Sequence, residues 1–138
     1  MQIAVVDGQG GGIGKTIIEK LRAELGDEIT ILALGTNALA TSCMLKAGAS
    51  EGATGENAIV FSAPKADIII GSIAILAASS MLGELTPAMA RAIAECSAKK
   101  VLIPLNRCNL YVMGITNEPL PHHVDYAINF VKKIIRGE

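Results

Sequence analysis

Short apolar runs alternate with segments of helical periodicity along almost the whole 138-residue chain. Runs with the length and composition of buried strands lie at residues 2–6, 29–34, 67–70 and 101–105, with a shorter candidate at 49–53. Between them, apolar residues recur every three or four positions, as in residues 13–25. This alternation predicts one α/β domain over residues 1–138, with a doubly wound, mostly parallel, Rossmann-like sheet between two helical layers.

The composition supports a core of aliphatic side chains. Hydrophobic residues make up 51% of the chain, whereas aromatic residues make up 3% and tryptophan is absent. Such composition is typical of a parallel sheet that helices cover on both faces. A net charge of −1, without a basic stripe or interleaved aromatic residues, argues against nucleic-acid binding.

One uncharged stretch, residues 68–83, deserves comparison with a membrane span. It is shorter than the roughly 20 apolar residues that a spanning helix needs, and Gly71 and three serines interrupt it. We therefore expect a buried strand that runs into a buried helix, and no membrane partner. The first residues lack the pattern of a signal peptide, and the three cysteines form no C-x-x-C pair, so we expect a cytoplasmic protein with reduced thiols.

The sequence also predicts helix caps, one buried helix face, a further strand and the last helix. Leu39, Cys43 and Met44 are expected on the buried face of a helix that follows Asn37, its candidate cap. Thr54 is a candidate cap of the next helix. Residues 110–115 are a candidate strand beside residues 101–105, and a last helix is expected from about residue 121, with its apolar face ending near residue 135.

The turn after the first predicted strand contains five glycines in seven residues. It reads Asp7-Gly8-Gln9-Gly10-Gly11-Gly12-Ile13-Gly14-Lys15-Thr16. Glycine allows positive φ and close approach of a ligand, and the first N–H groups of the following helix point at any anion placed there. The turn therefore predicts a binding site for a phosphate-bearing ligand; the alternative is a tight turn that is merely glycine-rich. Asp7 is expected to support the loop by accepting its N–H groups.

Two families share parts of this loop. The spacing Gly8-x-x-x-Gly12-x-Gly14 resembles the cofactor loop of short-chain dehydrogenases, although Asp7 replaces their usual threonine. The end of the loop, through Lys15 and Thr16, resembles a deviant P-loop, but Gly10 stands where that family has its signature lysine. A P-loop enzyme also needs an aspartate after a second apolar strand to position Mg²⁺, and neither the 67–70 nor the 101–105 run ends in one.

The identity of the ligand stays open in the sequence. A dinucleotide site commonly has an acid at the end of the second strand to bind a ribose hydroxyl, but here Thr36 and Asn37 follow that strand. The hydroxyl of Thr36 and the amide of Asn37 are compatible with NADP, or with ribose contacts other than the usual carboxylate. NAD or NADP is the first expectation, and ATP or GTP with Mg²⁺ the alternative.

Evidence for catalysis is weak. The Tyr-x-x-x-Lys pair of short-chain dehydrogenases is absent, since Ile115 lies four positions after Tyr111 and Phe130 four after Tyr126. The segment Asn106-Arg107-Cys108-Asn109 directly follows a predicted strand, where ligands of such sheets lie. Arg107 can pair with a phosphate or carboxylate there.

Six strings of the sequence together resemble a small family of uncharacterised bacterial Rossmann-like proteins, a domain of unknown function. They are DGQGGGIG, ALGTNALAT, MLKAGA, EGATGENAIV, ADIIIG and LIPLNRCN, and the match covers roughly residues 2–111. The resemblance implies a stand-alone, cytoplasmic, Rossmann-like domain. It implies no catalytic residue.

The sequence thus predicts a nucleotide-binding protein that acts as a sensor or subunit, with a small NAD(P)-dependent oxidoreductase and an atypical NTPase as alternatives. Residues 68–85 are largely apolar, and one small domain does not easily bury them all, so a homo-oligomer is also expected. No metal site is expected. The candidate binding residues are Gly8, Gln9, Gly10, Gly11, Gly12, Ile13, Gly14, Lys15, Thr36, Asn37, Gly71, Asn106 and Arg107.

Overall fold

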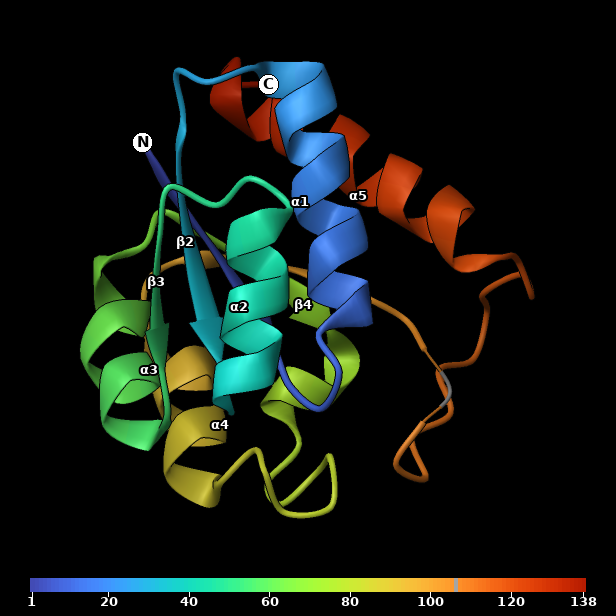
Figure 1. The fold of residues 1–138 in the computed structure, drawn as a ribbon. Helices are drawn as coiled ribbons and strands as arrows, with labels where there is room; N and C mark the ends of the chain where they lie inside the picture. Colours follow the sequence, from blue (N-terminus) through green and yellow to red (C-terminus); the bar gives the residue numbers. More distant parts are fainter. Residues whose placement is uncertain (106) are drawn as a thin grey trace.

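The computed structural model describes residues 1–105 and 107–138, and its centre is a five-stranded sheet (Figure 1). All neighbouring strands are parallel, in the order β3-β2-β1-β4-β5. The strands are β1 (Gln2–Asp7), β2 (Thr30–Gly35), β3 (Glu51–Thr54), β4 (Ile68–Ser72) and β5 (Lys99–Ile103). The predicted α/β class and doubly wound parallel sheet are therefore confirmed.

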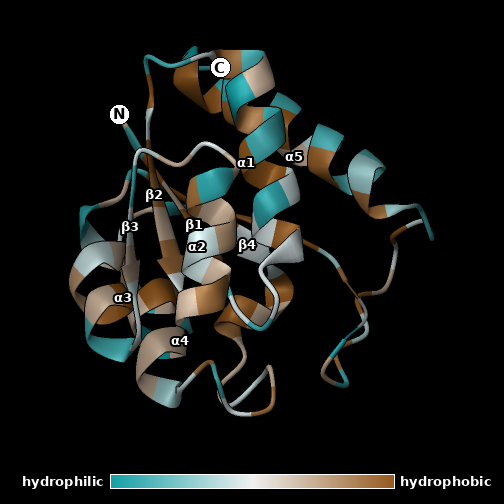
Figure 2. Ribbon diagram, viewed as in Figure 1, coloured by the Kyte–Doolittle hydropathy of each residue, from teal (hydrophilic) through white to brown (hydrophobic). Residues whose placement is uncertain are grey.

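Helices cover both faces of the sheet because successive strand residues point to opposite sides. Ile3 and Val5 of β1 pack in a cluster with α1 (Gly12–Leu25), α2 (Ala38–Lys46) and α5 (Leu120–Ile135). Ala4 and Val6 pack in a second cluster with α3 (Glu56–Ser62) and α4 (Pro87–Glu95). Figure 2 shows the apolar strands between these two helical layers.

Two short 3₁₀ helices complete the elements, η1 (Ala63–Lys65) and η2 (Ile73–Leu76). The expected helix after β4 is thus only one turn of 3₁₀ helix, and turns at residues 77–85 follow it. Most of this apolar stretch is buried within the single chain, but Leu82 is 97% exposed. Burial removes most of the reason to expect a homo-oligomer, which stays a prediction. In the described part of the chain, every helix is too short or too polar to cross a bilayer.

Of the residues predicted near helix starts, one was placed correctly and two were not. Asn37 caps α2, because its side-chain Oδ1 accepts the N–H of Ala40 at 2.9 Å. Thr54 was wrongly predicted as a cap: Gly55 holds that position, and the Thr54 hydroxyl instead donates to Thr41 Oγ1 at 2.7 Å. Leu39 was also wrongly predicted as buried, since it is 67% exposed.

Predictions toward the C-terminus were confirmed in part. The last helix begins at Leu120 and buries Val124, Ile128 and Val131, but Ile135 is 37% exposed at its end. Residues 110–115 form no strand, so the prediction of a further strand beside β5 was wrong. The three cysteines are free thiols, as expected.

Candidate functional site

The glycine loop connects the carboxyl end of β1 to the start of α1. Its turn closes where the Gly11 N–H donates to the Gly8 carbonyl at 3.0 Å, and Gly11 has a φ of 75° that favours glycine. The first helical hydrogen bond follows, from the Lys15 N–H to the Gly11 carbonyl at 2.9 Å. Among the described residues, the N–H groups of Gly12 and Ile13 have no hydrogen-bond partner. The start of α1 therefore presents free donors.

Asp7 holds this loop from inside. The residue is 5% exposed, and its carboxylate accepts hydrogen bonds from the N–H of Gly8 at 2.8 Å and the N–H of Gly14 at 2.7 Å, one on each oxygen. These bonds agree with the expected supporting role of Asp7. Burial raises the pKa of the Asp7 carboxyl above its ordinary value, although the two N–H groups and the charge of Arg107 oppose that rise.

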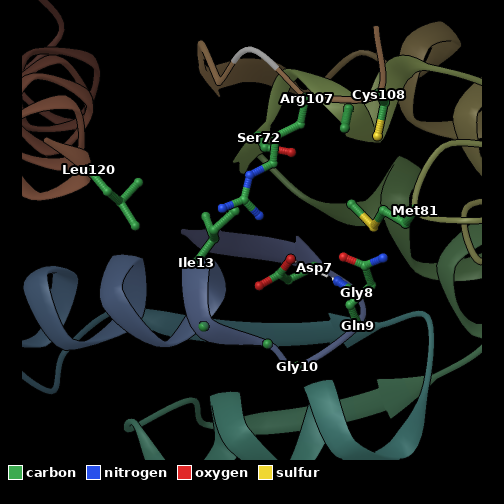
Figure 3. A pocket seen from close by; sticks show the side chains of 13 residues that line it. Asp7, Gly8, Gln9, Gly10, Ile13, Ser72, Met81, Arg107, Cys108 and Leu120 are labelled. Carbon is green, nitrogen blue, oxygen red and sulfur yellow. Dashed lines mark hydrogen bonds between the residues drawn. The ribbon is translucent and has the colours of Figure 1, made fainter. Parts of the chain in front are cut away.

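A pocket of about 370 Å³ opens beside the loop. It lies between the carboxyl ends of β1 and β4, where the strand order reverses and where sheets of this type bind ligands. Figure 3 shows the side chain of Arg107 directed into it, toward Ile13 and Asp7. The pocket is lined by Asp7, Gly8, Gln9, Gly10, Gly11, Gly12, Ile13, Ser72, Ala74, Met81, Arg107, Cys108 and Leu120.

The five loop glycines fall into two groups. A Cβ on Gly8, Gly11 or Gly14 would lie within 3.0 Å of other protein atoms, so a side chain there would displace its neighbours; at Gly11 the nearest neighbour is backbone. A Cβ on Gly10 or Gly12 would meet nothing within 4 Å, and neither residue has a positive φ. Both nevertheless line the pocket. The packing and backbone of this chain do not explain why these two positions are glycine.

Other predicted site residues lie outside the pocket. Thr36 and Asn37 contact Glu84 instead. Gly71 lies inside β4, where a Cβ would come within 2.8 Å of the Val6 carbonyl oxygen, so close strand packing accounts for it. Lys15 is exposed, and its ammonium lies 3.9 Å from a carboxylate oxygen of Glu19. Asn106 lies outside the described residues.

Sequence reasoning missed Glu84. Its Oε1 accepts hydrogen bonds from the Gln9 N–H at 2.9 Å, the Thr36 hydroxyl at 2.7 Å and the Asn37 amide at 2.7 Å. These three bonds lower the pKa of the Glu84 carboxyl, that from Gln9 most. No local pattern marks Glu84, because its partners lie 47 to 75 positions away.

The titratable groups offer little for metal binding. Within residues 1–105 and 107–138, no three side chains of histidine, cysteine, aspartate or glutamate gather as a metal site. The described residues after β4 and β5 include no aspartate close to either strand end.

The buried carboxyl of Asp7 should make the free energy of unfolding depend on pH. Because its folded pKa is raised, its stabilising contribution is complete below the ordinary value of 3.8 and is lost as pH rises through the folded pKa. Relative to Asp7→Asn, which lacks this titration, the wild-type free energy of unfolding should therefore fall over that window. Urea unfolding of both proteins at a series of pH values measures it. Parallel profiles would show that Asp7 titrates normally in the folded chain.

One comparison with a solved structure agrees with the fold. No curated protein matches the chain. Among solved structures, apo saccharopine dehydrogenase (L-glutamate-forming) from Saccharomyces cerevisiae is similar, with 14% identity and a TM-score of 0.50 over 92% of this chain. The match covers 24% of that enzyme's chain. A dodecameric FMN-dependent UbiX-like decarboxylase from Escherichia coli O157:H7 has 16% identity and a TM-score of 0.46, over 96% of this chain and 77% of that one.

The family resemblance read from the sequence is confirmed, and the match extends beyond the predicted residues 2–111. Residues 2–136 match the model of the family described as Domain of unknown function (DUF3842), and the protein therefore belongs to this family.

Proposed function

We propose that the protein binds a phosphate-bearing, nucleotide-type ligand at the glycine loop and acts as a sensor or binding subunit. The phosphate accepts hydrogen bonds from the free N–H groups of Gly12 and Ile13 at the start of α1. The guanidinium of Arg107, on the opposite wall of the pocket, provides the counter-charge.

The observation that carries the proposal is the open space at Gly10 and Gly12. Both residues line the pocket, and a Cβ on either would contact no protein atom within 4 Å. A side chain there would project into open space beside the pocket and not into the core. Glycine at such positions is typical of loops whose backbone approaches a phosphate closely.

The electrostatics of the loop support an anionic ligand despite the nearby carboxylate. The Asp7 carboxylate accepts hydrogen bonds from the N–H groups of Gly8 and Gly14. The N–H groups of Gly12 and Ile13 therefore stay available to a ligand. The raised pKa of Asp7 also reduces the free energy needed to neutralise its carboxylate beside an anion. The positive end of α1 and Arg107 both favour negative charge in the pocket.

NAD and NADP are the first ligands to test, because dinucleotides bind Rossmann domains at this crevice. The panel should also contain NMN, FMN, AMP, ATP–Mg²⁺ and GTP–Mg²⁺. A ligand at 100 times its Kd adds about 2.7 kcal/mol to the free energy of unfolding, which a thermal melt detects readily. Failure of every phosphate compound to bind at millimolar concentration would contradict the proposal.

Arg107→Ala tests the proposed counter-charge. Because hydrogen bonds to charged groups contribute about 1.5–3 kcal/mol, the affinity for the bound compound should fall by about tenfold to about 150-fold in calorimetric titration. The melting temperature without ligand should hardly change, since the Arg107 side chain is exposed. Lys15→Ala, which removes a charge near the loop but outside the pocket, should have a smaller effect. Equal losses in both variants would indicate a general charge effect.

A further inference from the structure

The pocket lies on the β4 side of the glycine loop. Beyond the loop itself, its lining comes from Ser72 at the end of β4, from Ala74 in η2, from Met81, from Arg107 and Cys108 after β5, and from Leu120 at the start of α5. Of the described residues at the end of β2, neither Thr36 nor Asn37 lines it. In a dinucleotide-binding Rossmann domain, the adenosine ribose lies at that second strand.

Glu84 closes this second side. Its Oε1 lies within hydrogen-bond distance of the Gln9 N–H in the loop and of the Thr36 and Asn37 side chains after β2. A ribose bound between the first and second strand ends would lie beside these same donors. One carboxylate oxygen of the protein already accepts hydrogen bonds from all three.

Met81 lines the pocket and belongs to the same segment as Glu84. It is 8% exposed, and its sulfur lies 2.6 Å from where a Cβ on Gly8 would be. The segment is well anchored, because Leu85 is fully buried and the Ser80 hydroxyl donates to the Ala74 carbonyl at 2.7 Å. The side chains of Met81 and Glu84 thus form a wall over the adenosine side of the loop.

We infer that the natural ligand is a phosphate monoester of one compact polar group, and not an adenine dinucleotide. The inference rests on the proposed function and narrows it to a ligand class. The phosphate occupies the start of α1, and the rest of the ligand extends toward Ser72, Arg107 and Leu120. A volume of about 370 Å³ is near the lower end of ligand pockets, which span roughly 300–1,000 Å³.

The wild-type protein alone tests the inference. Calorimetric titration should compare NMN, FMN, AMP and ribose 5-phosphate with NAD⁺ and NADP⁺. At least one monophosphate should bind about tenfold or more tightly than either dinucleotide. Preference for NMN, FMN or AMP would identify a mononucleotide. Preference for ribose 5-phosphate would identify a sugar phosphate, which keeps the proposed phosphate site but replaces the nucleotide-type ligand. A dinucleotide that binds as tightly as the best monophosphate would overturn the inference, whereas failure of every compound would overturn the proposed function.

Two substitutions at Glu84 test the role of the wall. Glu84→Ala opens the ribose side, so affinity for NAD⁺ should rise by about tenfold while affinity for the best monophosphate changes by less than about twofold. Glu84→Gln keeps the side-chain volume and an acceptor oxygen, so its affinity for NAD⁺ should stay low. If Glu84→Ala instead weakens the binding of NAD⁺, Glu84 is a ribose ligand and the inference is wrong. Melting temperatures without ligand verify that both variants fold.

Discussion

Gly12→Val is expected to fold like the wild-type protein and to lose binding of the phosphate ligand. The valine Cβ meets nothing within 4 Å outside its own helix, and Gly12 has no positive φ, so the position has room for a side chain and the backbone is not strained. Valine also has a higher helix propensity than glycine at the start of α1. The free energy of unfolding without ligand should therefore change by less than about 1 kcal/mol.

The loss of binding follows from where the new side chain projects. Gly12 lines the pocket, so the valine side chain occupies the space in front of the N–H groups that would hold the phosphate. Affinity for the tightest-binding compound of the panel should fall by about hundredfold or more, which equals about 2.8 kcal/mol. Calorimetric titration of the variant and the wild-type protein gives the ratio.

A matched control separates this effect from a general change in α1. Ala23→Val introduces the same side chain on the exposed far part of the helix, outside the pocket. It should leave the affinity unchanged. If Gly12→Val binds the compound as well as the wild-type protein does, the phosphate does not lie at the start of α1 and the proposed function fails.

The fold was largely predictable because its signals are local. A strand buried on both faces appears as a short apolar run, and a helix such as α1 repeats its apolar residues at the helical period. Residues 110–115 show the limit of this reasoning. Their apolar composition resembles a strand, yet they form none, because pairing beside β5 depends on the path of the chain and not on composition.

Helix α2 shows a second limit. Leu39 fits the helical period, but the buried face of this nine-residue helix is formed by Ala40, Thr41 and Met44. Thr41 faces inward because it bonds with Thr54 from β3, which no period analysis reveals. Tertiary partners thus decided which side of a short helix is buried.

The candidate site was predictable only in outline. The glycine loop and Arg107 could be identified from their positions after strands, since ligands of parallel sheets lie at carboxyl ends. The roles of individual glycines could not, because Gly12 and Gly14 look alike in the sequence and differ only in what surrounds them. Glu84 could not be found either, since its contacts join distant parts of the chain.

Gly35 illustrates a glycine that the fold requires, and Gly35→Ala is expected to have the largest effect on stability. A Cβ there would lie 2.2 Å from Thr41 Oγ1, 2.7 Å from the Thr41 nitrogen and 2.8 Å from the Asn37 carbonyl oxygen. Two of these atoms belong to the backbone of the first turn of α2, so they cannot rotate away. The free energy of unfolding should fall by about 3 kcal/mol, and the melting temperature by about 10 °C.

The source of this loss can be separated by two further variants. Gly10→Ala adds the same methyl group where nothing lies within 4 Å, so its melting temperature should match the wild-type value to within about 2 °C. Thr41→Ala removes the Oγ1 contact but leaves the two backbone contacts. Combined with Gly35→Ala, it should therefore restore less than half of the lost stability in urea unfolding. Full recovery in the double variant would mean that the Thr41 hydroxyl alone excludes a side chain at position 35, and that the backbone between β2 and α2 can yield.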